Sequence, residues 1–483
     1  MWFCGCRGYA RGLAASVVAC AALPFSLTLA RCDTLETALV QAYLNNPSLN
    51  AQRAAVRSTD EGVPQALSGY RPKITVNGTG GQQSTSSLTK VVSPNLPPTA
   101  SPNNQATYAL QSGYNTPANF GATITQTLFN GFQTANKTRQ AESQVLAARA
   151  TLRVTEQTVL LNAATAYMNV LRDSATLDLQ RRNVEVLQEQ LRQTRDRFNV
   201  GEVTRTDVAQ SESRLAQGRS QVLAAEANYN ASVATYRQVI GVNPGNLTPG
   251  TPVDRYSPRN LPAAVDLSIA VHPAVTTAQY NVDAAVLQVK VAEASLYPTV
   301  SVTGNYTKNY EVLGSLNTIQ QYQASVLGTI SIPIYQGGAE YSLVRQAKET
   351  LGQRRLDLDT ARDQVRQTTV QSWGQLEAAK ATVDSAQAQV QASEIALNGV
   401  REEARVGQRT TLDVLNAQQE LVNARVQLVS AQRDRVVFSY TLLAAIGRLA
   451  PEVLGLQVPA YQPMVHYQQV RDAWVGIRNP DGR

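Results

Sequence analysis

Residues 200–208 read Val-Gly-Glu-Val-Thr-Arg-Thr-Asp-Val, and the stretch recurs at residues 406–414 as Val-Gly-Gln-Arg-Thr-Thr-Leu-Asp-Val. Each copy lies between two long stretches that contain no proline and are rich in Ala, Gln, Leu, Val and Arg. Most of these residues lose little conformational freedom in a helix, so the composition favours helices on both sides. Each copy is therefore predicted to be the sharp turn of a long helical hairpin.

The two turns have the same local chemistry. A glycine suits the left-handed position that ends the incoming helix, because a Cβ is penalised there. A threonine caps the outgoing helix, and an aspartate in its first turn faces the positive end of the helix dipole. The predicted residues are Gly201, Thr204 and Asp207 in the first turn and Gly407, Thr410 and Asp413 in the second, with Thr206 as an alternative cap.

The N-terminal segment 1–30 is predicted to be a secretory signal peptide. Arg7 and Arg11 precede an uncharged run that ends in small residues at Ala30, where signal peptidase would cut. A transmembrane anchor is one alternative, although the run is barely long enough. Lipid attachment at Cys20 is another, but it would leave an apolar stretch on the mature chain.

The positions of the cysteines and the distribution of charge argue against a disulfide-stabilised protein and against a nucleic-acid-binding protein. All four cysteines lie in or next to the leader (Cys4, Cys6, Cys20 and Cys32), so the exported chain has no disulfide framework. The formal net charge is +7, but Lys and Arg are spread among Asp and Glu along the predicted helices. We therefore expect a solvated helical exterior and no nucleic-acid partner.

The mature chain is a tandem duplication. Asn46-Pro47 matches His272-Pro273, and Leu128-Phe129-Asn130-Gly131 matches Ile334-Tyr335-Gln336-Gly337. Each repeat is predicted to contain one helix (about 34–68 and 266–295), a strand, a loop, a second strand and the long hairpin. An insertion rich in Ser, Pro and Asn at 93–104 is predicted to be a loop of the first copy. The predicted boundaries are 31–244 for the first repeat, 245–265 for a linker, 266–447 for the second repeat and 448–483 for a C-terminal tail.

The predicted strands have the pattern of a lipid-spanning barrel. Residues 299–307 read Thr-Val-Ser-Val-Thr-Gly-Asn-Tyr-Thr, and residues 324–332 alternate in the same way. Lys90 is the only charged residue between 74 and 136, and only Lys308 and Glu311 are charged between 294 and 339. Barrel strands of about ten residues carry one apolar and one polar face in this manner. A soluble sheet with one wet face is the alternative, but its wet face would normally carry Lys and Glu.

Four strands per chain are too few to close a barrel. About eight strands is the smallest number that leaves a packed interior, and an open edge in lipid leaves backbone groups unpaired. Three copies would supply twelve strands, so we expect a homotrimer.

The helices extend far beyond the size of a globular core. No proline or glycine occurs between Gly131 and Asn199, so that helix could run about 100 Å. Near the tips the apolar residues recur every seven positions, which predicts antiparallel coiled coils. The heptad residues are Leu177, Val184, Leu191 and Phe198 with Leu187 and Thr194; Val383, Val390, Leu397 and Ala404; Val208, Leu215 and Val222; and Leu415, Val422, Val429, Val436 and Leu443.

The duplicated unit, the glycine after each strand-to-helix turn (Gly131 and Gly337) and the two tips together resemble the TolC family of outer-membrane efflux and secretion channels. The resemblance covers nearly the whole mature chain. It implies an α+β membrane protein: a twelve-stranded trimeric β-barrel in the outer membrane of a Gram-negative cell, continuous with a long α-helical coiled-coil tunnel across the periplasm. It also implies a periplasmic adaptor and an inner-membrane pump as partners, for multidrug efflux or type I protein secretion, and a tail on the tunnel exterior.

The same resemblance implies a gate at the tips. A ring aspartate that narrows the pore corresponds to Asp413, a linking arginine to Arg409, and its partner aspartate on the first hairpin to Asp207. Two positions depart from the family pattern: a second ring aspartate is Asn416 here, and a latch tyrosine is Ala404. We therefore expect a gate that is less negative and less firmly latched.

Two other classes of function fit the sequence less well. An enzyme is disfavoured because the only histidines are His272 and His466, and neither lies in a catalytic triad, metal-ligand or cofactor-binding motif. A trimeric coiled-coil spacer or adhesin without pore activity would explain the long helices. It would not explain the strand pairs without charged residues.

Overall fold

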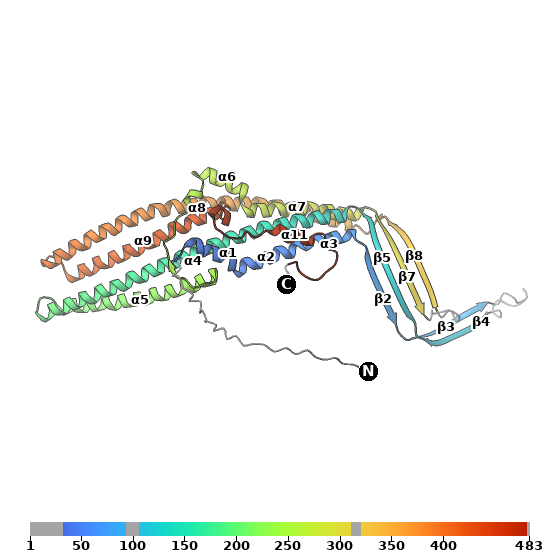
Figure 1. Ribbon diagram of the computed structural model, residues 1–483, viewed down its shortest axis with the longest axis horizontal. Helices are drawn as coiled ribbons and strands as arrows, with labels where there is room; N and C mark the ends of the chain where they lie inside the picture. The colour runs from blue at the N-terminus through green and yellow to red at the C-terminus, as the bar shows by residue number, and fades with distance from the viewer. Residues whose placement is uncertain (1–31, 93–105, 311–319, 481–483) are drawn as a thin grey trace, which may run out of the picture.

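The computed structural model describes residues 32–92, 106–310 and 320–480. The predicted signal peptide and the predicted insertion at 93–104 lie outside these ranges. The molecule is elongated, with long helices at one end and strands at the other (Figure 1).

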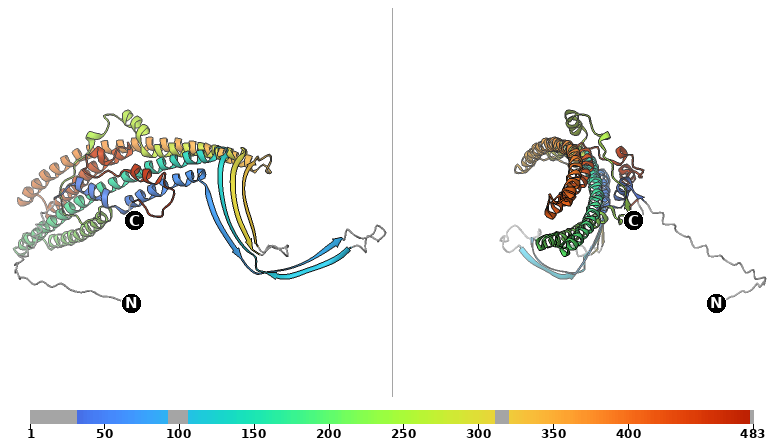
Figure 2. Two further views of the ribbon diagram at one scale, coloured as in Figure 1. Left: turned by 45° about the vertical axis from the view of Figure 1, so that its right-hand side comes forward. Right: turned by 90° about the vertical axis from the view of Figure 1, so that its left-hand side faces the viewer.

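Four long helices form the two hairpins. The helices α4 (Gln133–Asn199) and α8 (Ala339–Arg405) each have 67 residues, and α5 (Arg205–Ile240) and α9 (Thr411–Ala445) return from the tips. At about 1.5 Å per residue each of the 67-residue helices is about 100 Å long, which confirms the expected length. In the right-hand view of Figure 2 the four helices form one curved layer.

The leading helix of each repeat is broken, and the prediction of single helices was wrong. In the first repeat the segments are α1 (Leu35–Asn45), α2 (Pro47–Asp60) and α3 (Gly62–Leu67), and in the second they are α6 (Leu261–Val271) and α7 (Pro273–Glu293). The main breaks fall at Asn46 and His272, each directly before a proline. Proline disfavours a helical conformation in the residue that precedes it, and both residues are extended, with ψ of 121° and 126°.

Asn46 and His272 each cap the helix that follows the break. The Oδ1 atom of Asn46 accepts from the backbone N of Ser48 at 3.0 Å, and Nδ1 of His272 accepts from that of Ala274 at 3.1 Å. Each side chain thus caps the helix that follows it. Burial lowers the pKa of His272.

The short helices continue the line of the returning helices, as expected. The Nδ2 atom of Asn46 donates to the carbonyl oxygen of Val239 at 2.9 Å, one residue before α5 ends. In the second repeat Gly447, with φ of +86°, lies directly against His272. The segment Leu261–Leu296 is apolar and long enough to cross a membrane by composition, but it is interrupted at His272, and its helix α7 packs on α4 and α8.

The sheet contains two strands from each repeat, as predicted. It comprises β2 (Lys73–Gly80), β5 (Ala118–Asn130), β7 (Thr299–Tyr310) and β8 (Gln320–Ser331), in the order β2-β5-β7-β8. All neighbours are antiparallel, and β5 pairs with β7 across the two repeats, with an irregularity between Thr127 and Phe129. The strands β2 and β8 are the edges of the sheet.

The first repeat carries an additional hairpin rather than only a longer loop. Its strands β3 (Gln83–Val92) and β4 (Ala106–Asn115) pair with each other alone and project beyond the sheet (Figure 1). The extra length of the first repeat therefore includes these two strands, which were not predicted. Their sequence gives little signal, because β3 begins with five polar residues in succession, Gln83 to Ser87.

A hydrophobic core with residues from both repeats lies where the repeats meet. The two-residue strands β1 (Cys32–Asp33) and β6 (Asn246–Leu247) pair in parallel beside it. The hydroxyl of Tyr167 on α4 lies 2.7 Å from the carbonyl oxygens of both Asp33 and Thr248. Asp33 is the last residue of β1 and Thr248 directly follows β6, so these contacts hold α4 against this small sheet. Within the described residues, 3₁₀ turns occur at Ser68–Tyr70, Asp254–Tyr256 and Ala294–Leu296.

The C-terminal tail lies on the convex side of the curved layer (Figure 2) and contains two short helices, α10 (Pro451–Leu454) and α11 (Pro463–Val470). His466 on α11 lies 3.1 Å from the carboxylate of Asp60, which is fully buried and also faces Arg149. This charged cluster holds the tail against α2 and α4.

Candidate functional site at the hairpin tips

The first tip is closed by a reciprocal cap. Gly201 has φ of +81°, which is the left-handed conformation expected for it. The backbone N of Thr204 donates to Oδ2 of Asp207 at 2.9 Å, and the backbone N of Asp207 donates to Oγ1 of Thr204 at 3.4 Å. These two bonds satisfy donors that a helix start leaves unpaired, so the predicted capping residues are confirmed.

The second tip repeats this geometry. Gly407 has φ of +83°, and Thr410 and Asp413 exchange the same bonds at 3.0 and 3.3 Å. Hydrogen bonds from the backbone and side chain of Thr410 lower the pKa of Asp413, and the charge of Arg409 contributes. Asp413 therefore stays an anion at neutral pH, held at an exposed position by its own helix start.

The predicted partners Arg409 and Asp207 do not meet within one chain. The Nε atom of Arg409 lies 2.9 Å from Oε2 of Glu403 on the same hairpin, and this bond raises the pKa of Arg409. The carboxylate of Asp207 is engaged by Thr204. A pairing of Arg409 with Asp207 between neighbouring chains stays a prediction.

The predicted coiled-coil faces hold for α4, α5 and α8 near the tips, but the predicted face of α9 was wrong. Leu191 and Leu215 are buried together in the first hairpin. In the second hairpin Leu397 packs against Val414 and Leu421, each one position before the predicted Leu415 and Val422. Phe198 is an exception, with 41% of its surface exposed. It lies one helical turn beyond Thr194, the last buried residue of α4.

One leucine joins the two hairpins, and its predicted place was wrong. Leu415 was expected to face its own hairpin, but it packs against Leu187, Leu191 and Leu215 of the first hairpin and is only 2% exposed. Its neighbour Val414 takes the position toward α8. A heptad pattern does not reveal this, because adjacent residues of one helix can face different partners.

A polar bond beside this leucine also joins the hairpins. The Nη2 atom of Arg214 on α5 donates to Oδ1 of Asn416 on α9 at 2.7 Å. Asn416 was predicted at the gate only as a neutral substitute for an aspartate. Arg214 was not predicted, since nothing in its own helix distinguishes it from the other exposed arginines.

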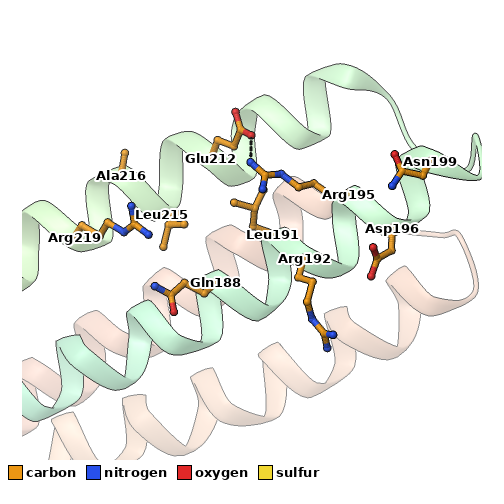
Figure 3. Close-up of a pocket in the computed structure, with 10 residues that line it drawn as sticks. All are labelled: Gln188, Leu191, Arg192, Arg195, Asp196, Asn199, Glu212, Leu215, Ala216 and Arg219. Carbon is orange, nitrogen blue, oxygen red and sulfur yellow. Dashed lines mark hydrogen bonds and ion pairs between the residues drawn. The ribbon is translucent and has the colours of Figure 1, made fainter.

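A groove of about 620 Å³ lies on the first hairpin near its tip (Figure 3). Leu191 and Leu215 form its floor, and Arg192, Arg195 and Arg219 lie along it. Arg195 pairs with Glu212 across the two helices, as the dashed line in Figure 3 shows. Asp196 and Glu212 also line the groove, so it presents charges of both signs above two largely buried leucines.

Comparison with known proteins matches both repeats. The family model described as "Outer membrane efflux protein" matches residues 38–242 and 264–448. The outer membrane efflux protein BepC of Brucella suis is 41% identical over 451 residues, which is 93% of each chain. The outer membrane protein TolC of Escherichia coli is 26% identical over 441 residues, which cover 87% of this chain and 84% of that protein.

The fold also matches solved structures. The CmeC outer membrane channel of Campylobacter jejuni superimposes with a TM-score of 0.72 at 16% identity, over 91% of this chain and 89% of that chain. The similarity at this identity concerns the fold alone.

Proposed function

This chain belongs to the outer membrane efflux protein family, and we propose that three copies of it form one channel. The chain lies in the outer membrane of a Gram-negative cell and provides an exit channel of the efflux or type I secretion kind. In the proposed trimer, β-sheets from three chains close a twelve-stranded barrel, and the curved helical layers form a tunnel beneath it.

The observation that carries the trimer is the open sheet. The strands β2 and β8 each have one neighbour, so each presents a row of unpaired backbone groups along its outer edge. Each such group costs several kcal/mol in hydrocarbon, so neither edge can face lipid. In a ring of copies, β8 of one chain pairs with β2 of the next. Three copies give twelve strands, which leave an aqueous lumen.

The helical layer supplies the tunnel in this proposal. Its concave side faces the axis, and its convex side, with the tail, faces the periplasm. The hairpin tips lie about 100 Å from the sheet, at the end that an inner-membrane pump and its periplasmic adaptor would reach. The groove on the first hairpin is the proposed adaptor contact, because it lies near the tip and presents charged side chains of both signs to a partner.

The gate in this proposal is formed by Asp413 and Arg409, with Asp207 and Asn416 beside them. Three copies of Asp413 around the axis would concentrate cations at a narrow mouth. Arg409 can leave Glu403 for Asp207 of a neighbouring hairpin at little cost, because all three side chains are exposed and pairs between exposed charges contribute little.

The function is tested on the purified mature protein. We expect light scattering in detergent to give the mass of three chains, and planar bilayers to show discrete single-channel conductance. A monomer would contradict the barrel, and a stable trimer without conductance would favour the spacer alternative.

Asp413→Ala should reduce the cation selectivity of the channel by roughly twofold or more and weaken block by multivalent cations, because the ring of carboxylates is lost. Reversal potentials in a salt gradient measure this. Thr410→Ala is the control, since it removes the hydroxyl of the same helix cap and keeps the carboxylate of Asp413. Equal changes of selectivity in both variants would leave Asp413 with only its capping role.

A further inference from the structure

The pairing register sorts the sheet into two faces. On one face the rows across β2, β5, β7 and β8 are polar: they are Thr75, Thr123, Asn305 and Ser325; Asn77, Gly121, Thr307 and Gln323; and Thr79, Asn119, Asn309 and Gln321. On the other face the rows are mostly apolar: they are Ile74, Ile124, Gly304 and Val326, and Val76, Ala122, Tyr306 and Ala324. In the proposed barrel the second face contacts lipid.

Lys308 lies on the apolar face. It pairs with Phe120 on one side and Tyr322 on the other, and Tyr306 and Tyr310 flank it along its own strand. These aromatic residues form a belt across the end of the sheet that is farther from the helices. Because the helices lie in the periplasm, this end lies in the outer leaflet.

In the proposed barrel, the position of Lys308 along β7 places it near the outer interface of the membrane. Lys308 lies eight positions after Val300, which is at the helical end of the strand, and this is about 27 Å along the strand. With a tilt of about 40°, this corresponds to about 20 Å of the roughly 25 Å apolar band of an outer-membrane barrel. A lysine at the midplane costs about 2–4 kcal/mol, but one near the interface costs about 0–1 kcal/mol. Its ammonium therefore lies among lipid headgroups.

The ammonium has aromatic neighbours but no anion within the described ranges. Its Nζ atom lies 4.6 Å from the ring centre of Tyr310 and 5.0 Å from that of Tyr322. The ion pairs between described residues do not include it. The rings hold the ammonium by their quadrupoles, and no carboxylate among the described residues pairs with it.

We propose that Lys308, with Tyr310 and Tyr322, binds the phosphorylated headgroup of an outer-leaflet lipid. This inference rests on the proposed function, since it needs the apolar face of the barrel in the membrane. Lys308 supplies a charge and three N–H donors to a phosphate oxygen. Tyr310 and Tyr322 pack against the upper part of the acyl chains, where aromatic side chains commonly lie.

The test uses bis-phosphorylated lipid A as the probe, added to the purified full-length trimer in detergent. Native mass spectrometry gives the dissociation constant for wild type, Lys308→Gln and Lys90→Gln. Lys90 is the matched control, because it pairs with Tyr108 on the hairpin β3–β4 outside the sheet. We expect Lys308→Gln to bind about fivefold more weakly, as about 1 kcal/mol per basic residue at an anionic surface implies, and Lys90→Gln to bind as wild type.

Equal affinity in Lys308→Gln and wild type would overturn the proposal. So would displacement of lipid A by millimolar inorganic phosphate, which would assign the site to a free anion. A change of ion selectivity in Lys308→Gln with unchanged lipid binding would place the lysine in the lumen instead. All variants are first checked for trimer mass and conductance, so a failure of the channel proposal is seen separately.

Discussion

Gly447→Ala should sharply reduce the yield of folded trimer and lower the temperature at which it dissociates. A Cβ at this position would lie 2.7 Å from Cα of His272 and 3.1 Å from Cδ of Pro273. Neither atom can move without shifting the break between α6 and α7. Overpacking costs about 1–3 kcal/mol, and the left-handed backbone adds about 1–2 kcal/mol for a residue with a side chain.

The duplication supplies the matched control for this substitution. Gly241 occupies the corresponding place in the first repeat, with φ of +91°, but its added Cβ would meet only Cβ of Asn45, at 3.5 Å. Gly241→Ala should therefore carry the left-handed cost alone. The temperatures at which the two variant trimers dissociate, measured by gel electrophoresis of unboiled samples, distinguish the effect of the steric clash from that of the backbone strain. Equal losses would show that the contact between Gly447 and His272 is unimportant.

Asp60→Leu should release the C-terminal tail. Asp60 is fully buried, and its carboxylate faces His466 at 3.1 Å and Arg149 at 3.5 Å. Removing it leaves the guanidinium of Arg149 in a largely buried place without an anion, and breaking a buried pair in this way costs about 3–5 kcal/mol. Limited proteolysis followed by mass spectrometry should then show rapid cleavage between Gly455 and Pro463, where wild type is resistant.

A second substitution distinguishes charge from packing at this cluster. Asp60→Leu combined with Arg149→Met replaces the ion pair by apolar side chains, which is often close to neutral for stability. The double variant should therefore recover much of the resistance to proteolysis. Glu61→Leu is the control at the neighbouring, partly buried carboxylate, which no ion pair among the described residues joins to the tail, and it should cleave as wild type. If the double variant is as sensitive as Asp60→Leu, then the tail is held by the shape of this contact and not by its charge balance.

The local features were predictable because they depend on neighbours in the chain. The caps at Thr204 and Thr410 and the left-handed glycines need only residues within one turn of a helix. The lengths of α4 and α8 follow from runs without helix-breaking residues, and the strand alternation follows from the two-residue period of an extended chain. The prolines at 47 and 273 also predict the breaks at Asn46 and His272, where a single helix was expected in each repeat.

The duplicated unit, the helix lengths, the capped tips and the two strand faces follow from local periodicity and backbone preference, so they can be predicted from the amino-acid sequence. The contact partners of individual residues become visible in the folded chain alone. Leu415 packs against the other hairpin, Arg214 bonds to Asn416, and Lys308 lies between two tyrosines. Contacts between residues far apart in the chain depend on how helices and strands are placed in space, and the periodicity of one segment carries no information about its neighbour.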